Sequence, residues 1–295
     1  SIVGNIETMK EYINFLDLPI HIESDSLVIR KKQYQIINCK NYSKVQFGET
    51  TKSSGKLASE ALEIAVERTI KKEFDAMVTM PISKSALYLA GWNFPGQTEM
   101  LAKRSNIKKP LMILCTRSLR VALATIHTPL KDVASEITEK ELIDKIQIFD
   151  KSLKNDFNIK EPHIAVLGLN PHAGESGSIG NEENEIITPA IENCEKMKIK
   201  VQGPFAADGF FAHGSYKNYD GIIGMYHDQG LIPLKLLAEG AGVNYTAGLP
   251  IVRTSPDHGT AFSIAGKNIA GFKSGTEAIE MAIRIAETRK MHEVD

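Results

Sequence analysis

Three of the eight histidines follow apolar segments that predict buried strands. His127 comes after VALAT, His172 lies in LNPHAGE after HIAVLGL, and His227 lies in MYHDQG after GIIGM. A carboxylate that could orient the imidazole follows each histidine in turn: Asp132, Glu175 and Asp228. A catalytic metal site needs three protein ligands, an open position and such orienting groups. The wide spacing matches no short metal motif, so the residues allow either one shared metal site or three unrelated structural histidines.

A second polar group follows the third histidine. Lys235, Asn244 and Arg253 lie in the segments LIPLK, GVNYT and GLPIVRTS. Cationic side chains with an amide donor suit a phosphate or a carboxylate, and the hydroxyls of Thr254 and Ser255 would add donors beside Arg253. The alternative is a set of solvated charges on a loop.

Familiar nucleotide-binding and nucleophile motifs are absent. Gly174, Gly177 and Gly180 are spaced GxxGxxG, which differs from the GxGxxG dinucleotide fingerprint. The chain also has no Walker A motif and no GxSxG. These absences argue against P-loop chemistry and against a serine nucleophile.

Apolar runs that predict short buried strands alternate with amphipathic runs that predict helices. The predicted strands are residues 75–80, 111–116, 121–125, 163–169 and 221–225, and the predicted helices are residues 57–72, 138–153, 182–197 and 274–288. This alternation indicates an α/β fold with a largely parallel sheet. Ligands of such folds bind at the carboxyl ends of strands, where the histidines lie.

Bulk composition narrows the class of protein. A chain of 295 residues is long enough for two lobes. The net charge of −1 gives no general attraction to nucleic acid or to a membrane, and we see neither a secretion signal nor an apolar run of membrane-spanning length. Three scattered cysteines without a CxxC motif indicate a reducing cytoplasm. Cys115, inside an apolar run, is expected to be a buried structural thiol.

Four long motifs make the chain similar to a known family. They are VALATIHTPLKDV, LNPHAGE-x4-GNEE, MYHDQGLIPLK and GVNYTAGLPIVRTSPDHGTAF, and the match runs from about residue 74 to residue 270. They closely resemble the 4-hydroxythreonine-4-phosphate dehydrogenase family of vitamin B6 biosynthesis. The resemblance implies oxidation and decarboxylation of 4-phosphohydroxy-L-threonine to 3-amino-2-oxopropyl phosphate with NAD or NADP. It also implies an isocitrate dehydrogenase-like α/β fold with a cleft between two lobes, residues 1–93 plus 258–295 and residues 94–257.

The resemblance further implies a homodimer with the active site at its interface. His127 and His172 of one subunit and His227 of the other would hold a divalent metal, commonly zinc, with magnesium or cobalt as alternatives. The residues that match the family's substrate contacts are Gln97, Thr98, Lys235, Asn244 and Arg253. Candidates for catalytic roles are Asp208, Asp228 and Lys235. The loop that holds the adenosine of the cofactor would comprise Asp257, His258, Gly259, Thr260 and Ala261.

Two departures from the family pattern leave alternatives open. Gln97 stands where the family often has histidine, and an amide cannot titrate near neutrality. A related dehydrogenase for 4-phospho-D-threonate or 4-phospho-D-erythronate is therefore a rival. The family also opens with a strand and a turn resembling GDPAGIGPE, and this sequence begins downstream of that segment, so we expect an open place in the first lobe's sheet. A metal-dependent phosphoesterase and an inactive binding protein are further alternatives.

Overall fold

The computed structural model describes residues 1–294 and divides into two compact units. The first unit comprises Ser1–Lys108 with His258–Phe272, and the second comprises Lys109–Asp257 with the C-terminal segment that starts at Lys273. In this division residues 94–108 belong to the first unit, and the C-terminal helix belongs to the second, where it packs along the last strand. The two lobes that the resemblance implies, residues 1–93 plus 258–295 and residues 94–257, stay a prediction.

The first unit contains a small mixed sheet in the order β1-β4-β3-β2. The strands of the first unit are β1 (Ile2–Gly4), β2 (His21–Glu23), β3 (Ser26–Ile29), β4 (Lys32–Asn38) and β5 (Ala76–Val78), of which β5 lies outside this small sheet. Its helices are α1 (Ile6–Phe15), α2 (Lys52–Ile70), α3 (Lys84–Leu89), α4 (Gln97–Arg104) and η5 (Phe262–Ile264). Gly55 lets α2 and α3 approach closely, because a Cβ there would lie 1.9 Å from the Ala86 carbonyl oxygen.

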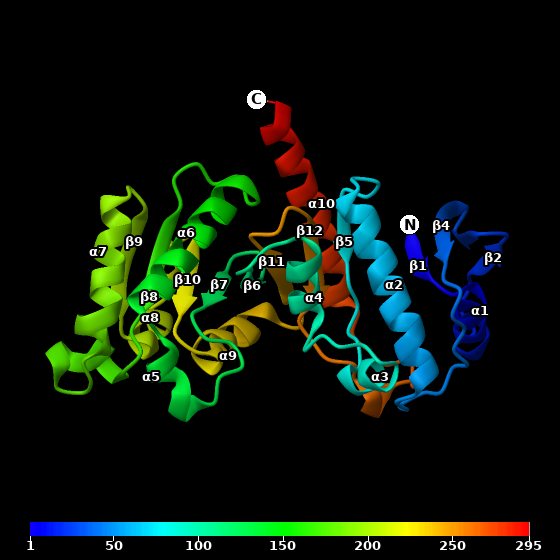
Figure 1. Cartoon of the computed structure of the whole chain (residues 1–295), viewed down its shortest axis with the longest axis horizontal. Coiled ribbons are helices and arrows are strands. Elements are labelled where there is room, and N and C mark those ends of the chain that lie inside the picture. Colours follow the sequence, from blue (N-terminus) through cyan, green and yellow to red (C-terminus); the bar gives the residue numbers. More distant parts are fainter. Residues whose placement is uncertain (295) are drawn as a thin grey trace. The chain divides into compact units, whose positions relative to one another are not determined.

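The second unit is built on a larger sheet whose strands follow the order β12-β11-β6-β7-β10-β8-β9 (Figure 1). These strands are β6 (Leu111–Cys115), β7 (Arg120–Leu123), β8 (His163–Leu167), β9 (Lys200–Phe205), β10 (Gly221–Gly224), β11 (Val243–Ala247) and β12 (Val252–Pro256). Pairing is parallel from β7 through β10 and β8 to β9, and antiparallel from β7 through β6 and β11 to β12. The sheet is thus mixed, which corrects the expectation of a largely parallel one.

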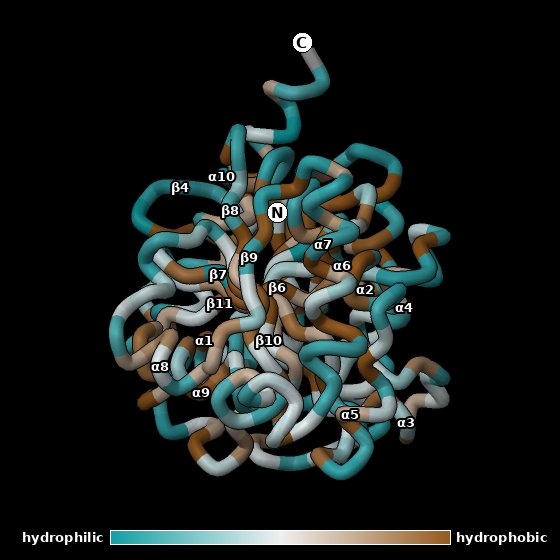
Figure 2. The backbone as a smooth tube through the Cα atoms, turned by 90° about the vertical axis from the view of Figure 1, so that its left-hand side faces the viewer, coloured by the Kyte–Doolittle hydropathy of each residue, from teal (hydrophilic) through white to brown (hydrophobic). Residues whose placement is uncertain are grey.

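Helices of the second unit accompany this sheet. They are η1 (Leu130–Asp132), α5 (Val133–Glu136), α6 (Glu139–Asn155), η2 (Pro171–Gly177), η3 (Glu183–Ile187), α7 (Thr188–Lys196), α8 (Ala207–Ala212), η4 (Ser215–Asn218), α9 (His227–Ala238) and α10 (Lys273–Val294). The last turns of α10 extend past the sheet in Figure 1 and are mainly hydrophilic in Figure 2. Among the described residues, no helix is both long and apolar enough to span a bilayer.

The five predicted strands and the four predicted helices are all confirmed, with small shifts at their ends. The apolar runs owe their strand conformation to complete burial: Ile113, Val121, Ile164 and Ile222 are each 0% exposed. Residues 182–197 begin as the π-helical turn η3 before they continue as α7. Strands β11 and β12 were not predicted from the sequence, because polar residues interrupt their apolar pattern.

All three cysteines are buried free thiols, as expected for Cys115. Burial raises the pKa of Cys39 and of Cys194 to about 11 and that of Cys115 to about 12. Because the thiolate is the nucleophile, a higher pKa means less of the reactive form at neutral pH.

We therefore expect iodoacetamide at about pH 8 to leave the folded protein unlabelled and to modify all three thiols in urea. Mass spectrometry of the intact chain counts the labels. Rapid modification of any one cysteine without denaturant would contradict the buried assignment.

Candidate metal and substrate site

The three predicted histidines follow three neighbouring parallel strands. In the sheet, β10 lies between β7 and β8 and runs parallel to both. His127 follows β7, His172 lies in η2 after β8, and His227 opens α9 after β10. Since the carboxyl ends of parallel strands meet at one edge of a sheet, the topology brings all three segments to that edge.

Within one chain, His127 and His227 are neighbours. Their ring centroids are 6.2 Å apart. The Nδ1 atom of His227 lies 2.7 Å from the Asp228 carboxylate, which leaves Nε2 as the nitrogen available to a ligand. Of the three carboxylates predicted to orient a histidine, only Asp228 does so within residues 1–294.

His172 does not join this pair. It starts a left-handed stretch of η2, in which φ is 53° at His172 and 58° at Ser176, and its side chain is exposed. Among the described residues, no three His, Cys, Asp or Glu side chains lie close enough to hold a metal ion. Within one chain the ring of His127 therefore lies beside that of His227. The expectation that His127 and His172 of one subunit share a metal with His227 of the other stays a prediction.

A buried carboxylate holds the segment that enters this left-handed stretch. Glu183 is 2% exposed, and its Oε1 accepts hydrogen bonds from the backbone N–H groups of Leu169 at 2.8 Å and Asn170 at 2.7 Å. The side-chain amide of Asn170 donates to Oε2 at 2.9 Å. A Cβ on Gly174 would lie 2.6 Å from the same carboxylate. Close packing around Glu183, rather than nucleotide binding, accounts for this glycine of the GxxGxxG run.

A partly buried lysine contacts the segment that leads to His127. The Nζ of Lys145, on α6, donates to the carbonyl oxygen of Ala124 just beyond β7. Burial lowers the pKa of Lys145, since desolvation disfavours the ammonium form. The sequence analysis did not predict this contact, because a lysine in an amphipathic helix is expected on the exposed face.

The predicted anion-binding residues of β11 and β12 share one face of the sheet. Arg253 is 4% exposed, and its Nη1 donates to the hydroxyl of Thr246 at 3.0 Å. The Oδ1 atom of Asn244 is buried and has no hydrogen-bond partner among the described residues. Alternation along β12 turns the Thr254 side chain to the other face, where it donates to the Ala278 carbonyl at 2.8 Å. The expectation that Thr254 assists Arg253 is therefore wrong.

Lys235, on α9, is exposed and lies next to a carboxylate. Its Nζ is 3.9 Å from Oδ2 of Asp257. A residue predicted to bind the substrate thus forms a loose ion pair with one predicted to bind the cofactor. Asp208 is exposed on α8. Gln97 and Thr98 open α4 in the first unit, where the Gln97 amide donates to the Met80 carbonyl at 3.3 Å.

The first unit contains a cavity of about 450 Å³ beside the predicted cofactor loop. Thr260 and Phe262 line it, together with the aromatic rings of Tyr12 and Phe47. His258 is exposed, with Nδ1 3.0 Å from the Gly259 carbonyl oxygen. Of the five residues predicted to hold the cofactor, Thr260 is the one that faces this cavity.

Known proteins share this sequence and fold. The family described as pyridoxal phosphate biosynthetic protein PdxA matches residues 1–282. A 4-hydroxythreonine-4-phosphate dehydrogenase of Bacteroides thetaiotaomicron is 48% identical over 86% of this chain and 71% of its own length, and one of Prosthecochloris aestuarii is 41% identical over 98% and 88%. The crystal structure of the Klebsiella pneumoniae enzyme of that name superposes with a TM-score of 0.83 at 35% identity, covering 96% of this chain and 88% of that one. These neighbours have the isocitrate dehydrogenase-like fold, which confirms the expected fold class.

Replacing Glu183 with Ala should lower the free energy of unfolding by about 3 kcal/mol, because it leaves buried N–H groups of Leu169 and Asn170 without an acceptor. Urea denaturation measures the change. Glu185→Ala is the matched control, because Glu185 is exposed in the same turn, and its effect should stay within about 0.5 kcal/mol. Equal losses for both variants would contradict the role of Glu183.

Proposed function

The chain belongs to the PdxA family of pyridoxal phosphate biosynthetic proteins, and we propose that it oxidises and decarboxylates 4-phosphohydroxy-L-threonine with NAD or NADP. The relatives named 4-hydroxythreonine-4-phosphate dehydrogenase support this activity. The observation that carries it is the pair His127–His227 at the carboxyl edge of the sheet, in the unit that also holds Asn244 and Arg253.

The imidazole pair fits a divalent metal of the zinc type. Two rings 6.2 Å apart can direct one nitrogen each at a common ion, and the Asp228 carboxylate orients the ring of His227. We infer that His172 of a second subunit supplies the third nitrogen, because no three candidate ligands lie together within the described residues of one chain. A metal bound there would polarise the substrate hydroxyl and, after oxidation, the ketone.

Exposed apolar side chains next to the histidines support a homodimer. Helix α9 starts at His227 and exposes Ile232 by 57% and Leu236 by 76%. Leu130, shortly after His127, is 72% exposed. Large apolar side chains gathered on a surface mark interaction sites. A second copy of the chain would cover them and bring its own His172 to the edge where His127 and His227 lie.

The polar residues of the second unit suit the two ends of the substrate. Arg253 and Lys235 supply positive charge for the phosphate and carboxylate groups. The unpartnered Oδ1 of Asn244 is an acceptor for the substrate's ammonium or hydroxyl group. Gln97 and Thr98 keep the substrate-binding role that the family pattern assigns to them.

The cavity beside Thr260 is the proposed place for the adenosine part of the cofactor. Its aromatic lining offers a stacking surface, and the Thr260 hydroxyl offers a hydrogen bond. A nicotinamide cofactor bound there would accept hydride from the secondary alcohol carbon, while the hydroxyl proton would go to a base. The resulting β-keto acid would lose CO2, with the electron pair of the broken C–C bond moving toward the ketone, and a proton would complete 3-amino-2-oxopropyl phosphate. Of the three candidates for proton transfer, Asp228 contacts His227 and Lys235 contacts Asp257, whereas Asp208 has no side-chain partner among the described residues.

Incubation with 4-phosphohydroxy-L-threonine and NAD should form NADH, and a chelator should suppress the rate by about 100-fold or more. Absorbance follows NADH, and parallel assays use 4-phospho-D-threonate and 4-phospho-D-erythronate. Faster NADH formation with either of these would favour the related dehydrogenase that Gln97 suggests. Release of inorganic phosphate without NAD would instead identify a phosphoesterase.

Mixing two inactive variants tests how the histidines are shared. If His127 and His227 act with His172 of the partner subunit, dimers re-formed from His127→Ala and His172→Ala chains contain one intact site, and about a quarter of the activity and bound metal should return. Mixing His127→Ala with His227→Ala should restore nothing, because every site then lacks one ligand. The opposite result would support the grouping of His127 with His172.

A further inference from the structure

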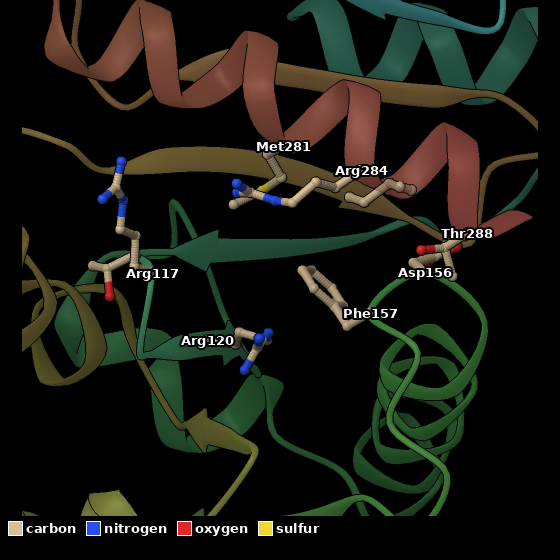
Figure 3. Close-up of a pocket in the computed structure, with 9 residues that line it drawn as sticks. Arg117, Arg120, Asp156, Phe157, Met281, Arg284 and Thr288 are labelled. Carbon is tan, nitrogen blue, oxygen red and sulfur yellow. The ribbon is translucent and has the colours of Figure 1, made fainter.

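The second unit contains a cavity of its own, which lies at the opposite edge of the sheet from the histidines. It has a volume of about 330 Å³, and three arginines line it: Arg117, Arg120 and Arg284 (Figure 3). Arg120 opens β7 at its amino end, whereas His127 follows the carboxyl end of the same strand. The cavity is therefore separate from the proposed metal site.

Arg120 has unused hydrogen-bonding capacity. Its Nη1 donates to the Asp220 carbonyl at 3.3 Å, while its buried Nε has no partner among residues 1–294. The guanidinium carbon lies 4.7 Å from the centre of the Phe157 ring. Stacking covers one face of the guanidinium and leaves its N–H edge for an acceptor in the same plane. A buried unpaired donor is costly, so a ligand that accepts from it gains affinity.

The other two arginines differ in how firmly they are held. Arg117 lies 2.6 Å from Glu277, whose side chain is only 12% exposed, whereas Arg284 is 54% exposed and lies 3.8 Å from Glu280. The exposed pair of Arg284 contributes little, so this guanidinium can exchange its carboxylate for another anion. In the view of Figure 3, the Arg284 side chain extends toward Arg117.

The carboxylate that lines the cavity does not oppose an anion. Asp156 accepts hydrogen bonds from Arg289, Ser152 and Tyr245, each at 2.7 Å. Arg289 thus already balances its charge. The remaining wall includes apolar side chains, among them Met281 and Ile285, which can pack against the body of a small organic molecule.

We propose that this cavity binds the phosphoryl group of a small metabolite, at a site distinct from the proposed substrate site. Guanidinium groups suit a tetrahedral oxyanion because each presents paired donors in a plane. Its distance from the histidine edge makes it a place for a bound effector rather than for the reacting substrate. The proposal does not depend on the proposed dehydrogenase activity.

Inorganic phosphate is the probe, titrated calorimetrically into the full chain carrying Lys235→Met, which weakens binding at the proposed substrate site. Phosphate should still bind, and adding Arg120→Met should raise the Kd by about 10-fold or more. Arg284→Met should also weaken binding, and it changes an exposed side chain that the fold does not need. Arg30→Met, an exposed arginine in the first unit, controls for net charge and should leave the Kd unchanged.

Thermal unfolding of each variant verifies that it is folded. Absence of phosphate binding in the Lys235→Met chain would overturn the proposal, as would a Kd that neither Arg120→Met nor Arg284→Met changes. Acetate at the same concentration should bind more weakly than phosphate. Equal binding of acetate would overturn the phosphoryl assignment.

Discussion

The candidate site depends on the parallel pairing of β10 with both β7 and β8. This pairing places the carboxyl ends of three strands at one sheet edge, and each strand is followed by a segment that carries a histidine. Apart from the half-buried Arg120 and His163, the residues of these strands are buried, so slipping any strand by one residue would turn apolar side chains toward the wrong face. The strand register that keeps the apolar side chains buried is therefore also the register that positions His127 and His227.

Two buried carboxylates of the second unit are stabilised by several hydrogen bonds each. The Asp156 carboxylate satisfies Arg289, Ser152 and Tyr245, and the buried Tyr245 has a pKa raised well above its ordinary value, chiefly by desolvation. Glu183 is satisfied by N–H groups of the segment before η2. Both clusters obey the rule that a buried charge must be paired or hydrogen-bonded. The buried donor of Arg120 and the buried acceptor of Asn244 depart from that rule, and both lie where we place a ligand.

A single chain brings together two of the three proposed metal ligands, near exposed apolar side chains. The rings of His127 and His227 are neighbours, no third candidate ligand completes a site among the described residues, and α9, which His227 begins, exposes leucine and isoleucine. One arrangement accounts for both features, namely a second copy that covers the apolar side chains and contributes its own histidine. Metal binding and subunit association would then be linked, since each would complete what the other needs.

The sequence by itself determined the fold class, the buried strands, the main helices and the motifs that identify the family. These features follow from local periodicity and from residue order. Both can be read from the sequence without knowing which residues contact one another in the folded chain. Strands β11 and β12 could not be predicted from the sequence, because polar residues such as Asn244 and Arg253 interrupt their apolar pattern. The direction of Thr254, the glycines around Glu183 and the grouping of His127 with His227 were likewise decided by tertiary structure. Strand order and turn handedness depend on contacts between residues distant in sequence, and no spacing along the chain encodes those distances.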